Sequence, residues 1–195
     1  MKSRVFHNIA TIYGMFYKYQ YKYYKGIFNK NKDFLDLALY KSIVDVGSGT
    51  GALCKVLHEY GFKVTGIEPV DKMIEIAKRK TGNNRICFKN GNVLEGLDLE
   101  DKSYDISISS YVAHGMNKDK RLKMYKEMAR VTKHKLIIYD YNQNRRLLND
   151  FVEWLEGGDY FNFIKEVEGE LENLFGEVQV IKVDKRAAWY VVNLQ

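Results

Sequence analysis

Hydrophobic positions alternate between two spacings from residue 42 to about residue 140. Short runs rich in β-branched residues predict strands, and stretches with an apolar residue every three or four positions predict helices. The predicted strands are 42–46, 62–67, 86–88, 104–109 and 135–140, with helices near 51–60 and 118–132 and a further helix that Asp71 can cap. Alternating strands and helices predict an α/β fold around a parallel sheet.

The last part of the chain has a different pattern. Residues 145–175 read as two helices interrupted at Gly157 and Gly158, and the acid-rich stretch Glu166–Glu172 is expected to be a solvent-exposed face. The β-branched runs 177–183 and 186–192 then follow almost without a gap. A connection that short joins only antiparallel strands. We therefore expect a seven-stranded, mostly parallel sheet with an antiparallel C-terminal hairpin and helices on both faces.

The N-terminal segment, residues 1–41, carries the charge excess of the chain. It holds eight Lys/Arg and two Asp, which accounts for the whole net charge of +6. An apolar helical stripe begins it, and tyrosines then alternate with lysine and glutamine, so helix and strand patterns conflict there. The stripe is formed by Ile9, Ile12, Tyr13, Phe16 and Tyr17, and the alternation covers residues 17–23. Such a segment can cover a substrate pocket, or contact RNA or an anionic membrane surface.

Length and composition favour one globular domain. We divide its 195 residues into a helical lid (1–41), a core (42–140), a helical insertion on the substrate side (141–176) and a terminal hairpin (177–195). No run approaches the roughly 18 apolar residues of a membrane-spanning helix, so integral membrane association is not expected. The N-terminus resembles no secretory signal, and the two cysteines are expected to stay reduced. These features predict a cytoplasmic protein.

Three glycines at alternate positions follow the first predicted strand and open a helix. Gly47, Gly49 and Gly51 allow positive φ angles and a close approach of a ligand to backbone N–H groups. About 20 residues later Glu68 ends the second strand, where a carboxylate can accept hydrogen bonds from ribose hydroxyls. Together they predict a site for a cofactor that contains a nucleoside.

Two classes of cofactor fit this loop. Gly47, Gly49 and Ala52 match the G-x-G-x-x-G/A pattern of dinucleotide enzymes such as NAD-dependent dehydrogenases. However, Asp45 lies beside the loop, where it would repel a pyrophosphate but can bind the cationic amino acid end of S-adenosylmethionine, directly or through water. The antiparallel hairpin is also foreign to the usual dinucleotide fold. The sequence therefore favours S-adenosylmethionine, with S-adenosylhomocysteine as the product.

Residues 42–140 resemble the class I S-adenosylmethionine-dependent methyltransferases, especially the group related to the ubiquinone and menaquinone biosynthesis enzymes. The resemblance rests on the loop Asp45-x-Gly47-x-Gly49-x-Gly51, on Gly66-Ile67-Glu68-Pro69 with Met73 and Ala77, on Gly91-Asn92-Val93, and on residues 104–116. It implies a Rossmann-like fold, in which Glu68 holds the ribose, a hydrophobe near Met73 flanks the adenine and Asn92 contacts its amino group. Asn92 stands where the family usually has Asp. The residues that we expect at the cofactor are Tyr13, Asp45, Gly47, Ser48, Gly49, Gly51, Glu68, Pro69, Met73, Asn92, Val93, Ser109 and Ser110.

Methyl transfer from a sulfonium mainly requires a well-placed acceptor and the exclusion of water. His114 follows the fourth strand and is the candidate general base, although it can equally pack the loop beneath the cofactor. The other histidines show no spacing that indicates a metal site. The single proline excludes the Asn/Asp-Pro-Pro-Tyr loop of amino-group methyltransferases and the Pro-Cys nucleophile of cytosine C5 methyltransferases.

The sequence does not identify the methyl acceptor. Aromatic residues between 151 and 163 favour an apolar or aromatic small molecule, but packing in the core would leave the same pattern. The alternatives are an RNA methyltransferase that uses the basic residues 1–41, and a non-catalytic protein that binds the cofactor. The oligomeric state stays open.

Overall fold

The computed structural model describes residues 2–82, 85–143 and 159–194, and describes side chains from residue 16 onward. The chain forms two compact units, Met1–Asn92 and Val93–Gln195, which we describe in turn. Across the described ranges, no helix is long and apolar enough to span a membrane. The first of the two helices expected within 145–175 lies outside these ranges. The division into four segments stays a prediction.

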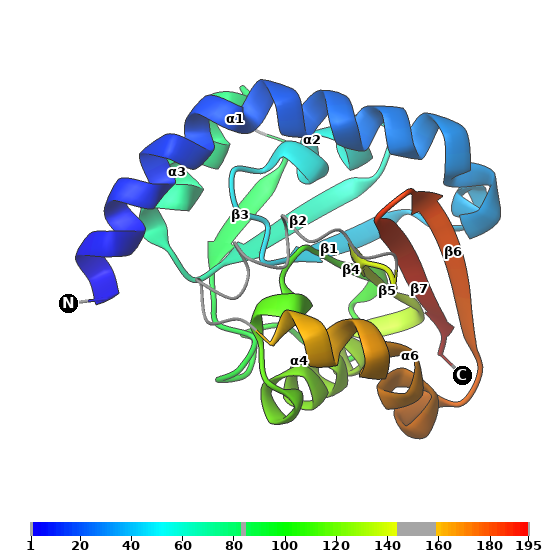
Figure 1. Cartoon of the computed structure of the whole chain (residues 1–195). Coiled ribbons are helices and arrows are strands. Elements are labelled where there is room, and N and C mark those ends of the chain that lie inside the picture. The colour runs from blue at the N-terminus through cyan, green and yellow to red at the C-terminus, as the bar shows by residue number, and fades with distance from the viewer. Residues whose placement is uncertain (1, 83–84, 144–158, 195) are drawn as a thin grey trace. The chain divides into compact units, whose positions relative to one another are not determined.

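The sheet has seven strands in the order β3-β2-β1-β4-β5-β7-β6 (Figure 1). Parallel pairing joins β1 to β2, β2 to β3 and β4 to β5, whereas β7 pairs antiparallel with both β5 and β6. The α/β architecture, the seven strands and the antiparallel hairpin predicted from the sequence are therefore confirmed.

The described residues of the first unit form three strands, three α-helices and two short 3₁₀ turns. Helices α2 and α3 pack on its strands, and α1 runs across both helices (Figure 1). The elements are α1 (Lys2–Asn31), η1 (Lys32–Leu35), η2 (Leu37–Leu39), β1 (Ser42–Val46), α2 (Ala52–Glu59), β2 (Lys63–Glu68), α3 (Asp71–Thr81) and β3 (Cys87–Asn90).

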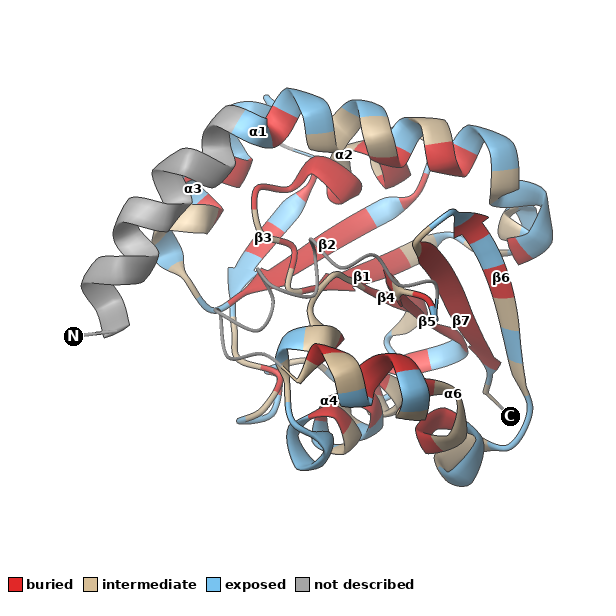
Figure 2. Ribbon diagram, viewed as in Figure 1, coloured by how far each residue is buried: buried red, intermediate tan, exposed pale blue. Residues whose placement is uncertain are grey.

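Helix α1 resolves the conflicting pattern of residues 17–23 in favour of a helix. Tyr17, Tyr24 and Phe28 recur at helical spacing and are buried, while Tyr19 is 71% exposed (Figure 2). The Tyr21 hydroxyl donates a hydrogen bond to Glu59 Oε2 of α2 over 2.7 Å. The alternation of tyrosine and lysine is therefore a helix with one buried aromatic side.

The start of α3 differs from the prediction. Asp71 is the first residue of the helix and does not cap it, because Val70 occupies the N-cap position with an extended backbone. The Asp71 carboxylate instead accepts a hydrogen bond from Asn90 Nδ2 over 2.7 Å. This bond joins α3 to the end of β3.

The second unit contains four strands and two described α-helices. Helix α4 packs on β4 and β5, and α6 packs on the β6–β7 hairpin and on α4. Strand β7 is buried along nearly its whole length, with Trp189 fully enclosed. The elements are β4 (Tyr104–Ser110), η3 (Ala113–Gly115), α4 (Lys118–Val131), β5 (Thr132–Tyr141), α6 (Tyr160–Phe175), β6 (Val178–Asp184) and β7 (Ala187–Asn193).

Candidate functional site

The glycine loop, residues 47–51, turns the chain from β1 into α2. Gly47, Gly49 and Gly51 have φ angles of 79°, 51° and 76°, which L side chains rarely adopt. A Cβ at Gly51 would lie 2.8 Å from Phe88 Cζ, so this glycine is also required by packing. A Cβ at Gly49 would meet no heavy atom within 4 Å. The middle of the loop therefore presents open backbone that a ligand can approach.

Glu68 lies at the end of β2 and binds this loop through its side chain. Its Oε2 accepts a hydrogen bond from the Gly49 N–H over 3.0 Å, and its Oε1 accepts one from the Val70 N–H over 3.1 Å. Burial raises the pKa of the Glu68 carboxyl, and the two N–H donors oppose that rise. Because each carboxylate oxygen can accept more than one hydrogen bond, both retain capacity for a ribose hydroxyl.

Asp45 lies in β1, one residue before its end, and its side chain is fully buried. The Cys54 thiol donates to Oδ2 over 3.2 Å, whereas Oδ1 accepts no hydrogen bond from the described residues. Burial raises the pKa of Asp45 to about 7, against the lowering effect of the Cys54 hydrogen bond. An unsatisfied buried acceptor is costly unless a donor reaches it. The site therefore fits a ligand with a cationic amino group.

The other predicted cofactor residues of the first unit lie around the ends of its strands. Pro69 is exposed directly after Glu68, and its carbonyl accepts a hydrogen bond from Asn90 Nδ2. Met73 lies in the first turn of α3, and Asn92 lies two residues past β3; both are half-buried. Ser48 is buried in the glycine loop. Their roles at the cofactor stay predictions.

The other four residues of the predicted set lie outside the described side chains of the first unit. Val93 precedes the strands of the second unit, and Ser109 and Ser110 are the last two residues of β4. Tyr13 lies on α1, but its side chain lies outside the description. Their roles stay predictions.

Sequence reasoning missed one contact of the glycine loop. The Thr50 hydroxyl donates a hydrogen bond to Gln20 Oε1 of α1 over 2.9 Å. Thr50 is 5% exposed, so this bond satisfies a buried polar group. The contact spans thirty positions, and no local pattern indicates it. It attaches the N-terminal helix directly to the loop.

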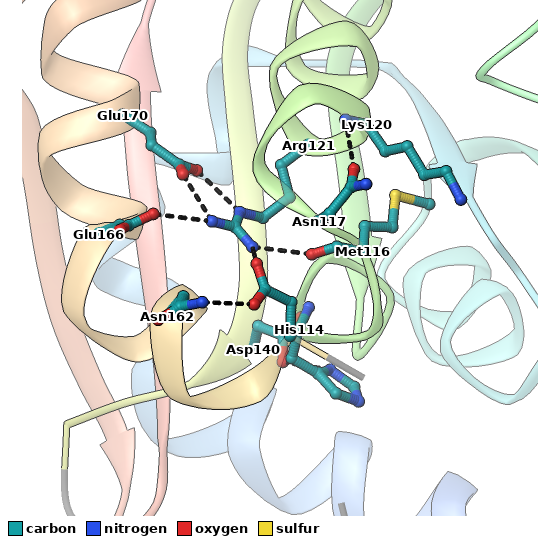
Figure 3. Close-up of polar contacts among 10 residues, drawn as sticks. His114, Met116, Asn117, Lys120, Arg121, Asp140, Asn162, Glu166 and Glu170 are labelled. Carbon is teal, nitrogen blue, oxygen red and sulfur yellow. Dashed lines mark hydrogen bonds and ion pairs between the residues drawn. The ribbon is translucent and has the colours of Figure 1, made fainter. Parts of the chain in front are cut away.

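In the second unit, His114 and Asp140 form a second polar centre. His114 lies in η3 after β4, and Asp140 lies near the end of the neighbouring strand β5. The ring Nδ1 is 2.8 Å from Asp140 Oδ1, and Asp140 is completely buried while the His114 side chain is 15% exposed (Figure 3). When the neutral ring donates its Nδ1–H to Asp140, the lone pair is on Nε2. This arrangement is that of a general base oriented by a carboxylate.

Aromatic rings surround this pair. The rings of Tyr111 and Tyr141 lie 6.5 and 4.8 Å from the His114 ring, and Tyr160 lies 5.1 Å from Tyr141 (centroid distances). Tyr111 has a φ of 54°, an uncommon conformation for a bulky residue, and its N–H donates to the Tyr139 carbonyl. The strand end is therefore shaped to bring aromatic side chains to His114.

Arg121 corrects one part of the expectation of a solvent-exposed face at Glu166–Glu172: Glu172 is exposed and Glu166 and Glu168 are half-exposed, but Glu170 is buried. The Arg121 side chain is fully buried in α4 and binds Glu170 through two parallel hydrogen bonds of 2.9 and 2.6 Å, and Glu166 over 3.1 Å (Figure 3). Glu170 is only 4% exposed. This side of α6 therefore faces α4. The buried partner of Glu170 is an arginine 49 positions away, so the local pattern of the acid-rich stretch does not reveal it.

Comparisons with known proteins agree with this geometry. A family model described as a methyltransferase domain matches residues 43–135, which include the glycine loop, Glu68 and His114. An uncharacterized methyltransferase of Bacillus licheniformis is 28% identical over 170 residues, and one of Anoxybacillus flavithermus is 31% identical over 113 residues. These matches cover 81% and 56% of this chain, and 76% and 52% of the two relatives.

A solved structure shares the fold. A protein from Methanococcus maripaludis assigned as an S-adenosyl-L-methionine-dependent methyltransferase matches with a TM-score of 0.75. It is 18% identical, and the match covers 97% of this chain and 93% of that protein. At that identity the likeness is one of fold, and it extends over nearly all of both chains.

Proposed function

We propose that this chain is a class I methyltransferase that uses S-adenosylmethionine, and that it methylates a small-molecule acceptor with His114 as the general base. The observation that carries the donor site is the hydrogen bond between Glu68 and the Gly49 N–H, which joins the expected ribose-binding carboxylate to the glycine loop. The relation to the ubiquinone and menaquinone enzymes and the cytoplasmic location stay predictions.

The residues of the first unit would each bind a different part of the donor. Glu68 would hold the ribose hydroxyls, and the open backbone at Gly49 admits the donor without a Cβ in the way. Asp45 would neutralise the ammonium group, while Met73 and Asn92 would flank the adenine ring. When bound, the donor supplies a methyl group carried on a positively charged sulfonium. Loss of this methyl group leaves S-adenosylhomocysteine, in which the sulfur is neutral.

His114 would remove the acceptor proton. Asp140 accepts the Nδ1–H and so fixes the tautomer with its lone pair on Nε2. Nε2 would accept the proton of an acceptor O–H or N–H, and the donor would supply the methyl group that takes the place of that proton. The buried Asp140 carboxylate then stabilises the imidazolium. Tyr111 and Tyr141 beside His114 favour an acceptor with a planar or apolar body.

Transfer of a labelled methyl group tests this proposal. Purified protein with methyl-tritiated S-adenosylmethionine is incubated with a small-molecule extract and, separately, with an RNA fraction. We expect label in the small-molecule fraction and its loss with His114→Ala, while His134→Ala, on the exposed part of β5, keeps it. Binding of S-adenosylhomocysteine with no transfer to either fraction would instead indicate a non-catalytic cofactor-binding protein. Full turnover by His114→Ala would exclude His114 as the general base.

A second candidate is RNA methylation, which one surface favours. Helix α1 contains no acidic residue over its thirty positions, and Lys18, Lys22 and Lys30 are exposed on it, as is Tyr19. Lysines with exposed aromatics are the side chains that bind single-stranded RNA. If RNA is the acceptor, Lys18→Glu/Lys22→Glu lowers labelling of the RNA fraction, and the wild-type affinity falls steeply with salt. Label that stays confined to small molecules excludes this candidate.

A further inference from the structure

Arg121 connects the turn that carries His114 to the segment that begins α6. Its Nη1 donates to the Met116 carbonyl (Figure 3) and to Asp159 Oδ2, both over 2.7 Å. Met116 lies two residues after His114, and Asp159 directly precedes α6 and Tyr160. One nitrogen therefore holds the turn that carries His114 and the start of the helix that carries Tyr160.

The first connection runs through the backbone of η3. The Met116 N–H donates to the Ala113 carbonyl over 3.0 Å, and the Gly115 N–H donates to the Val112 carbonyl over 3.3 Å. These bonds make the 3₁₀ turn a compact unit in which His114 is the central residue. A bond to the Met116 carbonyl therefore restrains the direction of the whole turn.

The second connection runs through aromatic packing. Asp159, held by Arg121 and by Asn162 Nδ2, fixes the first residue of α6, Tyr160. The Tyr160 ring packs edge-on against Tyr141, and Tyr141 packs edge-on against His114. The His114 ring therefore packs against Tyr141, which in turn packs against the residue that follows Asp159, a partner of the same guanidinium.

All five N–H groups of Arg121 are used. Nε–H and one Nη2–H bind Glu170, the other Nη2–H binds Glu166, and both Nη1–H groups make the two connections. The paired bonds to Glu170 fix the plane of the guanidinium and so aim Nη1. A lysine has three donors and no fixed plane, and cannot reproduce this geometry.

We propose that Arg121 is a positioning residue that sets the orientation of the His114 ring toward Asp140 through Met116 and Asp159. It touches neither His114 nor the reacting atoms; its effect passes through the turn and through Tyr160. The consequence for turnover rests on the proposed function, in which His114 is the base. The consequence for the ring itself does not, and can be measured without an acceptor.

The test follows the ring nitrogens of His114 by NMR in full-length protein labelled with ¹⁵N-histidine, assigned with His114→Asn. The variant is Arg121→Lys. The control is Arg130→Lys, because Arg130 lies on the same helix and also uses all five donors, but binds Glu127, Asp101 and the carbonyls of residues 97 and 99. The affinity for S-adenosylhomocysteine is measured for each protein.

We expect Arg121→Lys to shift or broaden the Nδ1 signal of His114 while S-adenosylhomocysteine affinity stays within about two-fold of wild type. Arg130→Lys should leave that signal unchanged. A wild-type His114 signal in Arg121→Lys overturns the proposal, and so does a uniform loss of all histidine signals and of binding. If Arg121→Lys does not fold, Arg121→Met/Glu170→Leu replaces the buried pair by apolar groups, a change that proteins often tolerate, and the same criteria apply. Failure of both to fold shows a purely structural role and overturns it.

Turnover supplies the second arm, once labelled product has been found. Arg121→Lys should lower kcat on the order of 10²-fold with KM for the donor unchanged, the cost of a small misplacement of a catalytic group. In a His114→Ala background it should cost nothing further, and an equal loss in both backgrounds overturns the proposal. If His114→Ala alone keeps wild-type turnover, the proposed base fails, but the NMR result still decides whether Arg121 positions the ring.

Discussion

Asp140 holds His114 at two points. Its Oδ1 lies 2.8 Å from the ring Nδ1, and its Oδ2 accepts the backbone N–H of His114 over 3.3 Å. The Tyr141 N–H also donates to Oδ1, over 2.8 Å. The carboxylate therefore fixes both the position of the residue and the tautomer of its ring.

Replacing Asp140 by Asn tests this relationship. An amide keeps the size of the side chain but can present its NH₂ group to Nδ1, which moves the ring proton to Nε2 and removes the base. Turnover should fall by at least about 10²-fold, the usual contribution of a general base. Labelled methyl transfer measures it, with S-adenosylhomocysteine binding unchanged. Asp105→Asn, which removes the negative charge 3.6 Å from the Lys133 ammonium group, is the control. Wild-type turnover by Asp140→Asn would refute the role of the pair.

Asp45 predicts a pH dependence of donor binding. Its pKa of about 7 means that the carboxyl is largely protonated at pH 6 and largely ionised at pH 8. Because the ionised form attracts an ammonium group, S-adenosylhomocysteine should bind about ten-fold more tightly at pH 8 than at pH 6. Isothermal titration across this range measures the slope, and Asp45→Asn should abolish it. An unchanged slope in Asp45→Asn would assign the titration to another group.

The same residue affects stability with a defined sign. Between about pH 4 and pH 7 the folded protein keeps Asp45 protonated while the unfolded chain ionises it. The contribution of Asp45 to the free energy of unfolding should therefore fall as pH rises through this window and stay constant above it. Comparing urea unfolding of wild type and Asp45→Asn at pH 5 and pH 8 isolates that contribution. A difference between the two proteins that does not vary with pH would contradict the raised pKa.

Gly49 and Gly51 should respond differently to replacement by alanine. At both positions a side chain lowers the free energy of unfolding by about 1–2 kcal/mol, because φ is positive. At Gly51 the new Cβ also meets Phe88 at 2.8 Å, which adds about 1–3 kcal/mol of overpacking. Gly51→Ala should therefore lose more stability in urea unfolding, whereas Gly49→Ala should mainly weaken S-adenosylhomocysteine binding. The reverse order would mean that the open backbone at Gly49 does not face the donor.

The contact between α1 and the loop predicts that the N-terminal helix supports donor binding. Gln20→Ala leaves the buried Thr50 hydroxyl without its acceptor, at a cost of about 1–3 kcal/mol. We expect a lower melting temperature and a several-fold weaker S-adenosylhomocysteine affinity. Thr50→Val removes the hydroxyl itself and should restore stability in the Gln20→Ala background. Equal losses from the single and double variants would show that the two side chains are not coupled.

Local signals were sufficient to predict the sheet and the positions of the glycine turn and of Glu68. The strands are β-branched runs, and Gly47, Gly49 and Gly51 lie at a turn that only glycine adopts easily, so both features are visible within a few residues. Glu68 could be placed because it ends the strand parallel to β1. The features that could be predicted are those that appear as short-range spacings of residues along the chain.

Long-range partners could not be predicted in the same way. His114 and Asp140 are 26 positions apart and meet because β4 and β5 are parallel neighbours, an inference that required the pairing of these two strands. Arg121 and Glu170 are both charged, and hydrophobic periodicity treats charged residues as exposed. Their mutual bonds make burial possible, and only the fold brings them together.

The most direct test of the account is the affinity of S-adenosylhomocysteine for Glu68→Gln, measured by isothermal titration. Glutamine replaces one carboxylate oxygen by an NH₂ group, so one of the N–H groups of Gly49 and Val70 loses its acceptor together with a ribose contact. The account predicts binding to wild type, a loss of about 10–100-fold in Glu68→Gln, and no change in Glu75→Gln on the exposed side of α3. Wild-type protein that binds NAD and not S-adenosylhomocysteine, or Glu68→Gln with wild-type affinity, would contradict it.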